Sequence, residues 1–228
     1  MKNSRWIICF DFETDSPDRD TCNPVQLAAV PIDPMTLEVK KSQAFNINIK
    51  PEGIDKPEYF DSEREKTINW HAENYGLTYE DIIEKWKNGV SEKVAWKNFC
   101  TYCSKYTVDK KPGQWFPDPI PAGYNITGFD IPIAMRLSKK YKTKLPFSEV
   151  NKLDAMDNLF WWFENLEEPY DYKMDTWRKF FGIKATGVAH DALTDVYEEA
   201  AIIIRFLKYH RKQSTVNKFK NSFEGIEI

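Results

Sequence analysis

The sequence has few glycines, cysteines and histidines, and its net charge is small. Its 228 residues include nine glycines, four cysteines and three histidines, and the net charge is −3. Four cysteines in a chain of this length do not indicate a disulfide framework, and the net charge argues against binding to nucleic acid through overall charge alone. No window approaches the roughly 18 uncharged apolar residues of a membrane span. We therefore expect neither a disulfide-rich secreted protein nor a membrane protein.

The residues that are present are sufficient for a sizeable core. Hydrophobic residues make up 42% of the chain, which holds eight tryptophans, eleven tyrosines and fifteen phenylalanines. The N-terminus "MKNSRWIICF" runs directly into strand-like sequence without a cleavable small-residue site. We expect one cytoplasmic domain over residues 1–228, with a basic C-terminal tail from about residue 209.

Three strand-like segments precede most of the helical ones. The alternation in "ICFDFET", "PVQLAAVPID" and "QAFNINIKP" predicts an antiparallel meander. Four helices are expected over residues 79–88, 92–106, 129–141 and 190–211, with one further strand over 122–126 and another before the last helix. This order predicts an α/β fold with a mixed five-stranded sheet and helices on both faces.

Paired carboxylates follow the first predicted strand. In "ICFDFETDS" the period of two places Asp11 and Glu13 on the same face. Two buried like charges repel each other, and a divalent cation between them is the simplest remedy. Asp130 lies where a strand gives way to a helix, and Asp195 lies about one turn into the last helix, so both should reach the end of the sheet. A cluster of four carboxylates indicates Mg²⁺ or Mn²⁺.

The same segments carry a family resemblance. "FDFET", "YNITGFD" and "HDALTD" have the order and approximate intervals of the three motifs of the DnaQ-like, or DEDDh, 3′-5′ exonuclease superfamily, which the chain resembles from about residue 5 to 208. The resemblance implies a ribonuclease-H-like fold in which "KLDAM" (152–156) is a strand. It also implies two divalent ions, Mg²⁺ or Mn²⁺. It makes His190 the general base. The catalytic metal ligands that it implies are Asp11, Glu13, Asp130 and Asp195.

Two segments are similar to particular branches of the superfamily. Asn125 stands five residues before Asp130, as in the proofreading domains of B-family DNA polymerases, although those usually carry tyrosine where this chain has His190. The segment "KTINWHAENYG" (66–76) is similar to a tryptophan-containing segment of phage and recombination-associated exonucleases. These likenesses suggest DNA replication, proofreading or repair, with a DNA polymerase as a candidate partner and a phage-encoded protein in a bacterial host as a candidate setting.

The expected substrate is a nucleic-acid 3′ end, DNA before RNA. The predicted function is hydrolysis of single-stranded or frayed DNA to nucleoside 5′-monophosphates; an exoribonuclease or oligoribonuclease, and a noncatalytic module that binds nucleic acid or a polymerase, are the alternatives. Terminal nucleotides need stacking surfaces and hydrogen-bond partners, and for the aromatic candidates core packing is the alternative. The candidates in or near the motifs are Phe12, Thr14, Trp70, His71, Asn125 and Phe129.

Three further features have ordinary explanations. Cys100 and Cys103 form a C-x-x-C pair that could be half of a zinc site or a redox pair, although their helical spacing favours a core-facing helix. The aromatic stretch "NLFWWFENLEEPYDY" (158–172) is acidic, so we expect a buried helix and not a nucleic-acid platform. The basic run at 205–220 could be a solvated helix end, or it could contact a substrate or partner.

Overall fold

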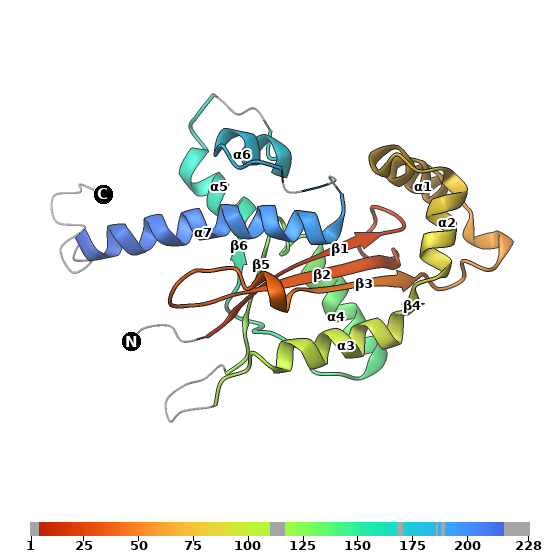
Figure 1. The fold of residues 1–228 in the computed structure, drawn as a ribbon, viewed down its shortest axis with the longest axis horizontal. Coiled ribbons are helices and arrows are strands. Elements are labelled where there is room, and N and C mark those ends of the chain that lie inside the picture. Colours follow the sequence, from red (N-terminus) through yellow and green to blue (C-terminus); the bar gives the residue numbers. More distant parts are fainter. Residues whose placement is uncertain (1–4, 110–116, 168–170, 186, 188–189, 217–228) are drawn as a thin grey trace.

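A mixed β-sheet forms the centre of the protein in the computed structural model, which describes residues 5–109, 117–167, 171–185, 187 and 190–216 (Figure 1). Six strands lie in the order β4-β3-β2-β1-β5-β6. Their bounds are β1 Ile7–Thr14, β2 Pro24–Ile32, β3 Phe45–Lys50, β4 Val90–Ser91, β5 Ile120–Gly123 and β6 Leu153–Asp154.

The pairing of the strands confirms the predicted meander. β1 pairs with β2 and β2 with β3 in antiparallel fashion, whereas β5 joins β1 and β6 joins β5 in parallel. The predicted number of five strands is wrong by one, because β4 is a two-residue strand beside β3 that is too short to show a period of two. The strand predicted over 122–126 ends at Gly123, because Asn125 has the left-handed φ of 57° and turns the chain away.

In the part of the chain that the structure describes, seven α-helices surround the sheet. Their bounds are α1 Ser62–Tyr75, α2 Tyr79–Lys87, α3 Glu92–Ser104, α4 Asp130–Tyr141, α5 Ala155–Phe163, α6 Met174–Phe180 and α7 Ala192–Val216, with short 3₁₀ turns at Lys41–Gln43 and Pro57–Tyr59. Figure 1 shows α3 and α4 on one face of the sheet and α7 on the other. Helices on both faces were expected from the sequence.

The two faces of β1 explain where its carboxylates point. Ile8 and Phe10 are fully buried in the cluster that includes α3 and α4, whereas Ile7 and Cys9 are buried against α7. Side chains alternate along a strand, so the side of Ile7 and Cys9 continues toward the carboxylates of β1. α7 covers this side, and its first turn carries Asp195.

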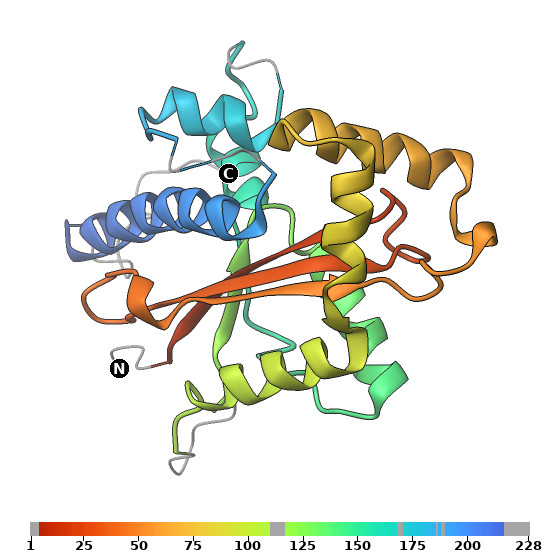
Figure 2. The same ribbon diagram turned by 45° about the vertical axis from the view of Figure 1, so that its right-hand side comes forward.

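α1 and α2 lie beyond the carboxyl end of β1, as Figure 2 shows. Thr78 is the N-cap of α2 and forms a reciprocal capping box with Asp81. Asp15, which is fully buried after β1, accepts hydrogen bonds from the Tyr59 hydroxyl at 2.8 Å and from Arg64 Nε at 3.0 Å. This network ties the first helix to the end of the central strand.

The C-x-x-C pair is part of the core. Cys103 is fully buried on α3 among the aromatic residues of that face, and Cys100 packs against the same cluster. Both thiols are free, and within the described residues no cysteine belongs to a group of candidate metal ligands. The core-facing helix expected from the spacing is confirmed.

Two expectations for the C-terminal third are wrong. α5 is not buried as a whole: Trp161 is 79% exposed and Phe160 57%, because the helix packs on α7 with one side and its aromatic outer side stays uncovered. The last helix, expected to end near residue 211, runs to Val216, and residues 217–228 lie outside the described residues. None of the described helices combines the length and apolar character that crossing a membrane requires.

Candidate active site

The four carboxylates of the motifs lie in one cavity of about 400 Å³ at the carboxyl ends of β1 and β5. They come from three different elements, and the histidine of the third motif lies immediately before α7. The motif residues that line the cavity are Asp11, Phe12, Glu13, Tyr124, Asn125, Phe129, Asp130, His190 and Asp195.

Local structure explains how the segments converge. Asp130 is the first residue of α4 and is 98% buried, and its Oδ1 accepts a hydrogen bond of 3.0 Å from the backbone N–H of Phe12. The second motif is thus hydrogen-bonded directly to β1, the strand that carries the first motif. Asp195 lies in the first turn of α7, where an acidic side chain complements the helix dipole.

Burial and mutual repulsion shift the acids of the cavity toward their protonated forms. Burial, opposed by hydrogen bonds from the backbone, raises the pKa of Asp130 to about 8. Burial and the charge of Asp11 raise the pKa of Asp195 to about 8 and that of Glu13 well above its ordinary value. The uncompensated cluster is therefore electrostatically strained near neutral pH, as expected for a site that holds cations.

This strain makes the stability of the metal-free protein depend on pH. Between about 4 and about 8 the folded form keeps protons on Asp130 and Asp195 that the unfolded form has lost, so the free energy of unfolding falls as pH rises. In EDTA we expect the melting temperature to drop from pH 5 to pH 8, and Mg²⁺ or Mn²⁺ to raise it more at pH 8 than at pH 5. Calorimetry of the wild type and of Asp195→Asn, whose profile should be flatter, measures this; a melting temperature that climbs with pH would contradict it.

The donor set fits a hard divalent cation. Ligand atoms of Glu13, His190 and Asp195 lie within 4.8 Å of one another. Carboxylate oxygens are the donors that Mg²⁺ and Mn²⁺ prefer. The sequence assigned His190 only the role of base, and within the described residues the structure also brings it within reach of an ion beside Glu13 and Asp195. Asp11 and Asp130 line the same cavity outside this tightest group.

A fifth carboxylate beneath the cluster was missed in the sequence. Glu199 is 96% buried on α7 and accepts a hydrogen bond from the Cys9 thiol, with sulfur and oxygen 3.7 Å apart. Burial, followed by the charges of Asp11 and Asp130, raises the pKa of Glu199 well above its ordinary value, which favours its neutral form. Its position four residues after Asp195, on the same helix face, was the signal that could have revealed it.

Two residues of α1 contact His190. The Tyr75 hydroxyl donates a hydrogen bond of 2.5 Å to the carbonyl oxygen of His190, and the Trp70 ring centroid lies 4.2 Å from that of the imidazole. His190 has the left-handed φ of 64°, a conformation that a non-glycine residue keeps only when its surroundings impose it. The two contacts from α1 supply that constraint.

Removal of the Tyr75 hydroxyl should loosen His190. For Tyr75→Phe we expect kcat in a nuclease assay to fall roughly fivefold to tenfold, the equivalent of one hydrogen bond, with little change in KM. Tyr79→Phe, on the neighbouring helix α2 and away from the cavity, is the matched control. Unchanged kcat in Tyr75→Phe, or an equal loss in the control, would show that the contact does not position His190.

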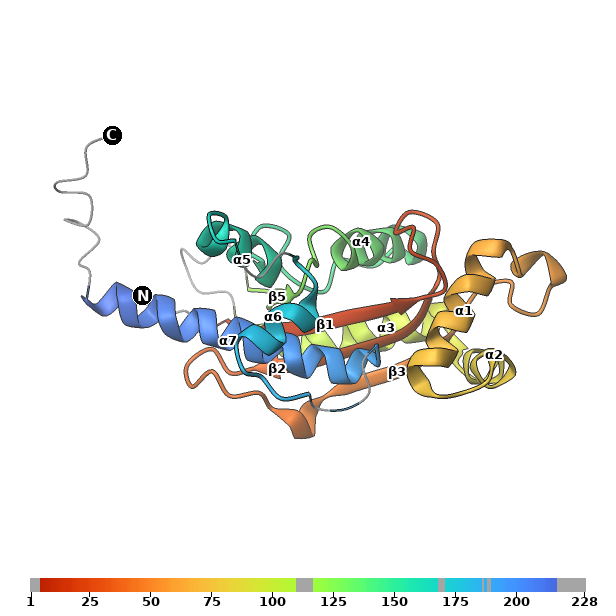
Figure 3. The same ribbon diagram turned by 90° about the horizontal axis from the view of Figure 1, so that it is seen from above.

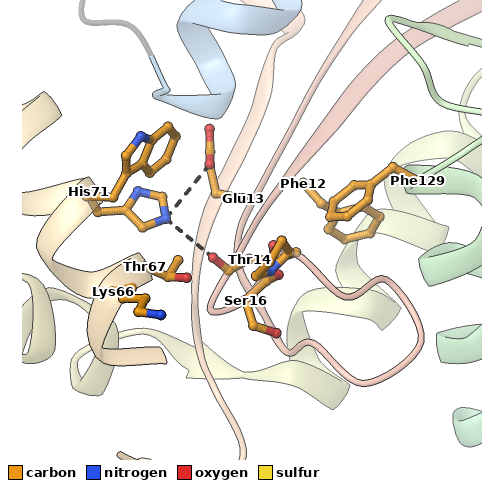
Figure 4. Close-up of a pocket in the computed structure, with 10 residues that line it drawn as sticks. Phe12, Glu13, Thr14, Ser16, Lys66, Thr67, His71 and Phe129 are labelled. Carbon is orange, nitrogen blue, oxygen red and sulfur yellow. Dashed lines mark hydrogen bonds and ion pairs between the residues drawn. The ribbon is translucent and has the colours of Figure 1, made fainter. Parts of the chain in front are cut away.

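A second cavity, of about 470 Å³, adjoins the first (Figure 4). The two share Phe12, Glu13 and Phe129. The remaining predicted substrate contacts of β1 and α1, namely Thr14, Trp70 and His71, also line it. Trp70 is 41% exposed, so its ring is available to a ligand.

Two of these candidates, His71 and Thr14, form hydrogen bonds within the protein. The Nε2 of His71 lies 3.3 Å from the carbonyl oxygen of Thr14 and 4.0 Å from Glu13 Oε2, as Figure 4 shows. His71 is 98% buried, and burial lowers its pKa to about 4, so the ring is neutral and donates to Thr14. The Thr14 hydroxyl donates in turn to the carbonyl of Ser16 at 2.8 Å. Both side chains order the strand end beneath the cavity.

The turn that carries Asn125 is held by Asp154, another residue missed in the sequence. Asp154 Oδ1 accepts from the backbone N–H of Asn125 at 2.9 Å and of Met156 at 3.0 Å, and its Oδ2 accepts from that of Thr127 at 2.9 Å. One buried carboxylate thus caps α5 and fixes the turn between β5 and α4. "KLDAM" was assigned only as a strand, because these partners lie up to 29 residues away in the chain.

Asp154→Asn should therefore impair both folding and activity. An amide keeps the shape but cannot accept at both ends, so we expect a loss of about 1–3 kcal/mol in the free energy of unfolding and a lower kcat/KM in the nuclease assay. Asp157→Asn, one turn along α5 and exposed, is the control for both measurements. Equal stability and activity in the two variants would refute this role for Asp154.

Comparisons with known proteins identify the fold. No family model matches the chain, and no curated protein matches its sequence. Among solved structures, E. coli exonuclease I in complex with a dT13 oligonucleotide is similar with a TM-score of 0.65 and 20% identity, over 95% of this chain and 45% of that one. Cell-death related nuclease 4 (CRN-4) is similar with a TM-score of 0.58 and 15% identity, over 90% of this chain and 64% of that one.

The chain therefore spans less than half the length of exonuclease I, although nearly all of this chain takes part in the match. The expected ribonuclease-H-like fold and the resemblance to DnaQ-like 3′-5′ exonucleases are confirmed at the level of the fold, which this chain shares with exonuclease I and CRN-4.

Proposed function

We propose that the protein is a metal-dependent 3′-5′ exonuclease, a single domain that hydrolyses single-stranded or frayed DNA to nucleoside 5′-monophosphates. The observation that carries the proposal is the convergence of four motif carboxylates and His190 in one cavity. Such a cluster destabilises the fold unless cations compensate it, so a purely structural role gives no reason for it.

Two divalent ions, Mg²⁺ or Mn²⁺, complete this site. Asp11, Glu13, Asp130 and Asp195 would hold them, and their oxygens suit both metals. When bound, the ions supply positive charge and Lewis acidity at a phosphate, which favour in-line displacement. Because Asp130 is also bonded to the Phe12 backbone, its carboxylate stays oriented toward the cavity whether or not ions are present.

His190 acts as the general base. Burial lowers its pKa below the ordinary value, so the ring is neutral at pH 7 and can accept the proton of the attacking water. The contacts from Trp70 and Tyr75 keep the ring at the cavity.

The second cavity receives the terminal nucleotide. Phe129 is half-buried and lines both cavities, so a base stacked on its ring would place its phosphate beside the carboxylates. Phe12, which was also predicted to contact the substrate, instead packs in the core, where it is 97% buried. The exposed ring of Trp70 lines the same cavity and offers a second stacking surface. The oligonucleotide bound to E. coli exonuclease I, a protein of the same fold, supports single-stranded DNA as the substrate class. Association with a DNA polymerase and a phage origin stay predictions from the sequence.

Analysis of the products tests the proposal. Purified protein with Mg²⁺ or Mn²⁺ is incubated with DNA and RNA oligomers of the same sequence, and the products are separated by chromatography. We expect nucleoside 5′-monophosphates, released faster from DNA. Faster release from RNA would make the protein an exoribonuclease, and intact oligomers with both metals would refute the exonuclease.

A further inference from the structure

A shallow apolar hollow of about 380 Å³ lies between α5, α6 and α7, away from the carboxylates. Its lining residues, which define the α5–α7 hollow, are Trp162, Phe163, Phe181, Arg205, Phe206 and Tyr209. Figures 1 and 3 show α5 and α6 beside α7. Trp162 and Tyr209 keep 42% and 44% of their surface exposed, and their ring centroids lie 4.8 Å apart at a near-perpendicular angle.

Positive charge borders the hollow on one side. From residue 200 to 216, α7 contains no aspartate or glutamate but carries four cationic side chains. Arg205 lines the hollow, and Lys208 and Lys212, which follow three and seven residues later, are exposed on the same side of the helix. Aromatic rings beside a cationic stripe are the combination with which proteins hold single-stranded nucleic acid without reading its sequence.

α5 and α7 connect this surface to the active site. Met156, at the start of α5, lines the carboxylate cavity, and Trp162 lies six residues, or about 9 Å, further along that helix. Along α7, Arg205 is ten residues from Asp195, or about 15 Å. A strand whose 3′ end occupies the cavity can therefore reach the hollow a few nucleotides upstream.

We propose that the α5–α7 hollow binds the single-stranded DNA upstream of the 3′ end. Trp162 and Tyr209 stack on a base, while Arg205 and Lys208 contact the flanking phosphates. This proposal rests on the proposed exonuclease function for its substrate. It gives a role to the exposed part of the aromatic stretch and to the basic run, neither of which the active site uses.

Trp161 provides a matched control on the same helix. It is the more exposed of the two tryptophans, but it does not line the hollow. Asp157 and Glu164, four residues before and three after it, share its side of α5 and repel phosphate. A contribution from any exposed tryptophan would appear in both variants, whereas the proposed site includes Trp162 and not Trp161.

The test combines binding and turnover. Anisotropy of labelled dT20 in EDTA measures affinity without metal-dependent cleavage. We expect Trp162→Ala to weaken binding roughly fivefold to fiftyfold and Trp161→Ala to change it less than about twofold. Lys208→Ala should reduce the slope of log affinity against log salt by about 0.7. With Mg²⁺, Trp162→Ala should leave hydrolysis of dT2 unchanged, because a dinucleotide does not reach the hollow.

Other outcomes separate the alternatives. Unchanged dT20 binding by Trp162→Ala, or equal losses in both tryptophan variants, would overturn the proposal. A dimer in sedimentation that Trp162→Ala dissociates, with DNA binding intact, would overturn it in favour of an interface between copies. If the wild type hydrolyses neither dT20 nor dT2 while the Trp162→Ala binding loss persists, the binding surface stands and the exonuclease function fails.

Discussion

Asp11→Asn and Asp195→Asn are each expected to lower kcat roughly 10³-fold or more while making the metal-free protein more stable. Activity falls because each carboxylate is part of the oxygen cluster that holds the cations. Stability rises because the charge of Asp11 is among the causes that raise the pKa of both Glu13 and Asp195, and its removal relieves that repulsion. The measurements are steady-state hydrolysis of a single-stranded oligomer and melting in EDTA.

The opposite signs of the two effects make this prediction demanding. Asp20→Asn, which removes an exposed carboxylate outside the cavity, is the control and should change neither quantity appreciably. A variant that loses activity because it folds poorly would melt earlier than the wild type, not later. Retained turnover in Asp11→Asn would show that the cluster is not catalytic.

His190→Ala should lower kcat by roughly 10²-fold to 10⁴-fold, the usual contribution of a general base. In the wild type, burial lowers the pKa of His190, so the rising limb of kcat against pH should lie below pH 6.5 and vanish in the variant. Calorimetric titration with Mn²⁺ should show that the carboxylates still bind ions. The exposed His210 provides the control variant His210→Ala.

Two results would contradict the assignment of His190 in different ways. Unchanged kcat would remove it from the reaction altogether. Loss of Mn²⁺ binding as severe as in Asp195→Asn would instead make His190 a metal ligand, a role that its distance from Glu13 and Asp195 permits.

The part of the site that depends on local geometry could be predicted from the sequence. The alternation of β1 placed Asp11 and Glu13 on one face, and the helix starts of the second and third motifs placed Asp130 and Asp195 at the same edge of the sheet. These inferences needed only the period of a strand and the position of a helix end.

The supporting residues could not be predicted, because long-range packing defines them. Tyr75 reaches His190 across 115 residues of sequence, and Cys9 reaches Glu199 across 190. No periodicity within one element reports such a contact. The exposed side of α5 was missed for a related reason: an aromatic-rich helix is buried only if another element covers it, and among the described residues α7 covers one side alone.

The most direct test of the exonuclease assignment is a time course of Mg²⁺-dependent degradation of one DNA oligomer labelled separately at its 5′ end and at its 3′ end. The carboxylate cavity and its adjoining aromatic pocket predict a ladder of progressively shorter products from the 5′-labelled strand and immediate release of a labelled mononucleotide from the 3′-labelled strand. Both should be absent with Asp11→Asn. Internal fragments from both strands, shortening from the 5′ end, or an unchanged oligomer would contradict it.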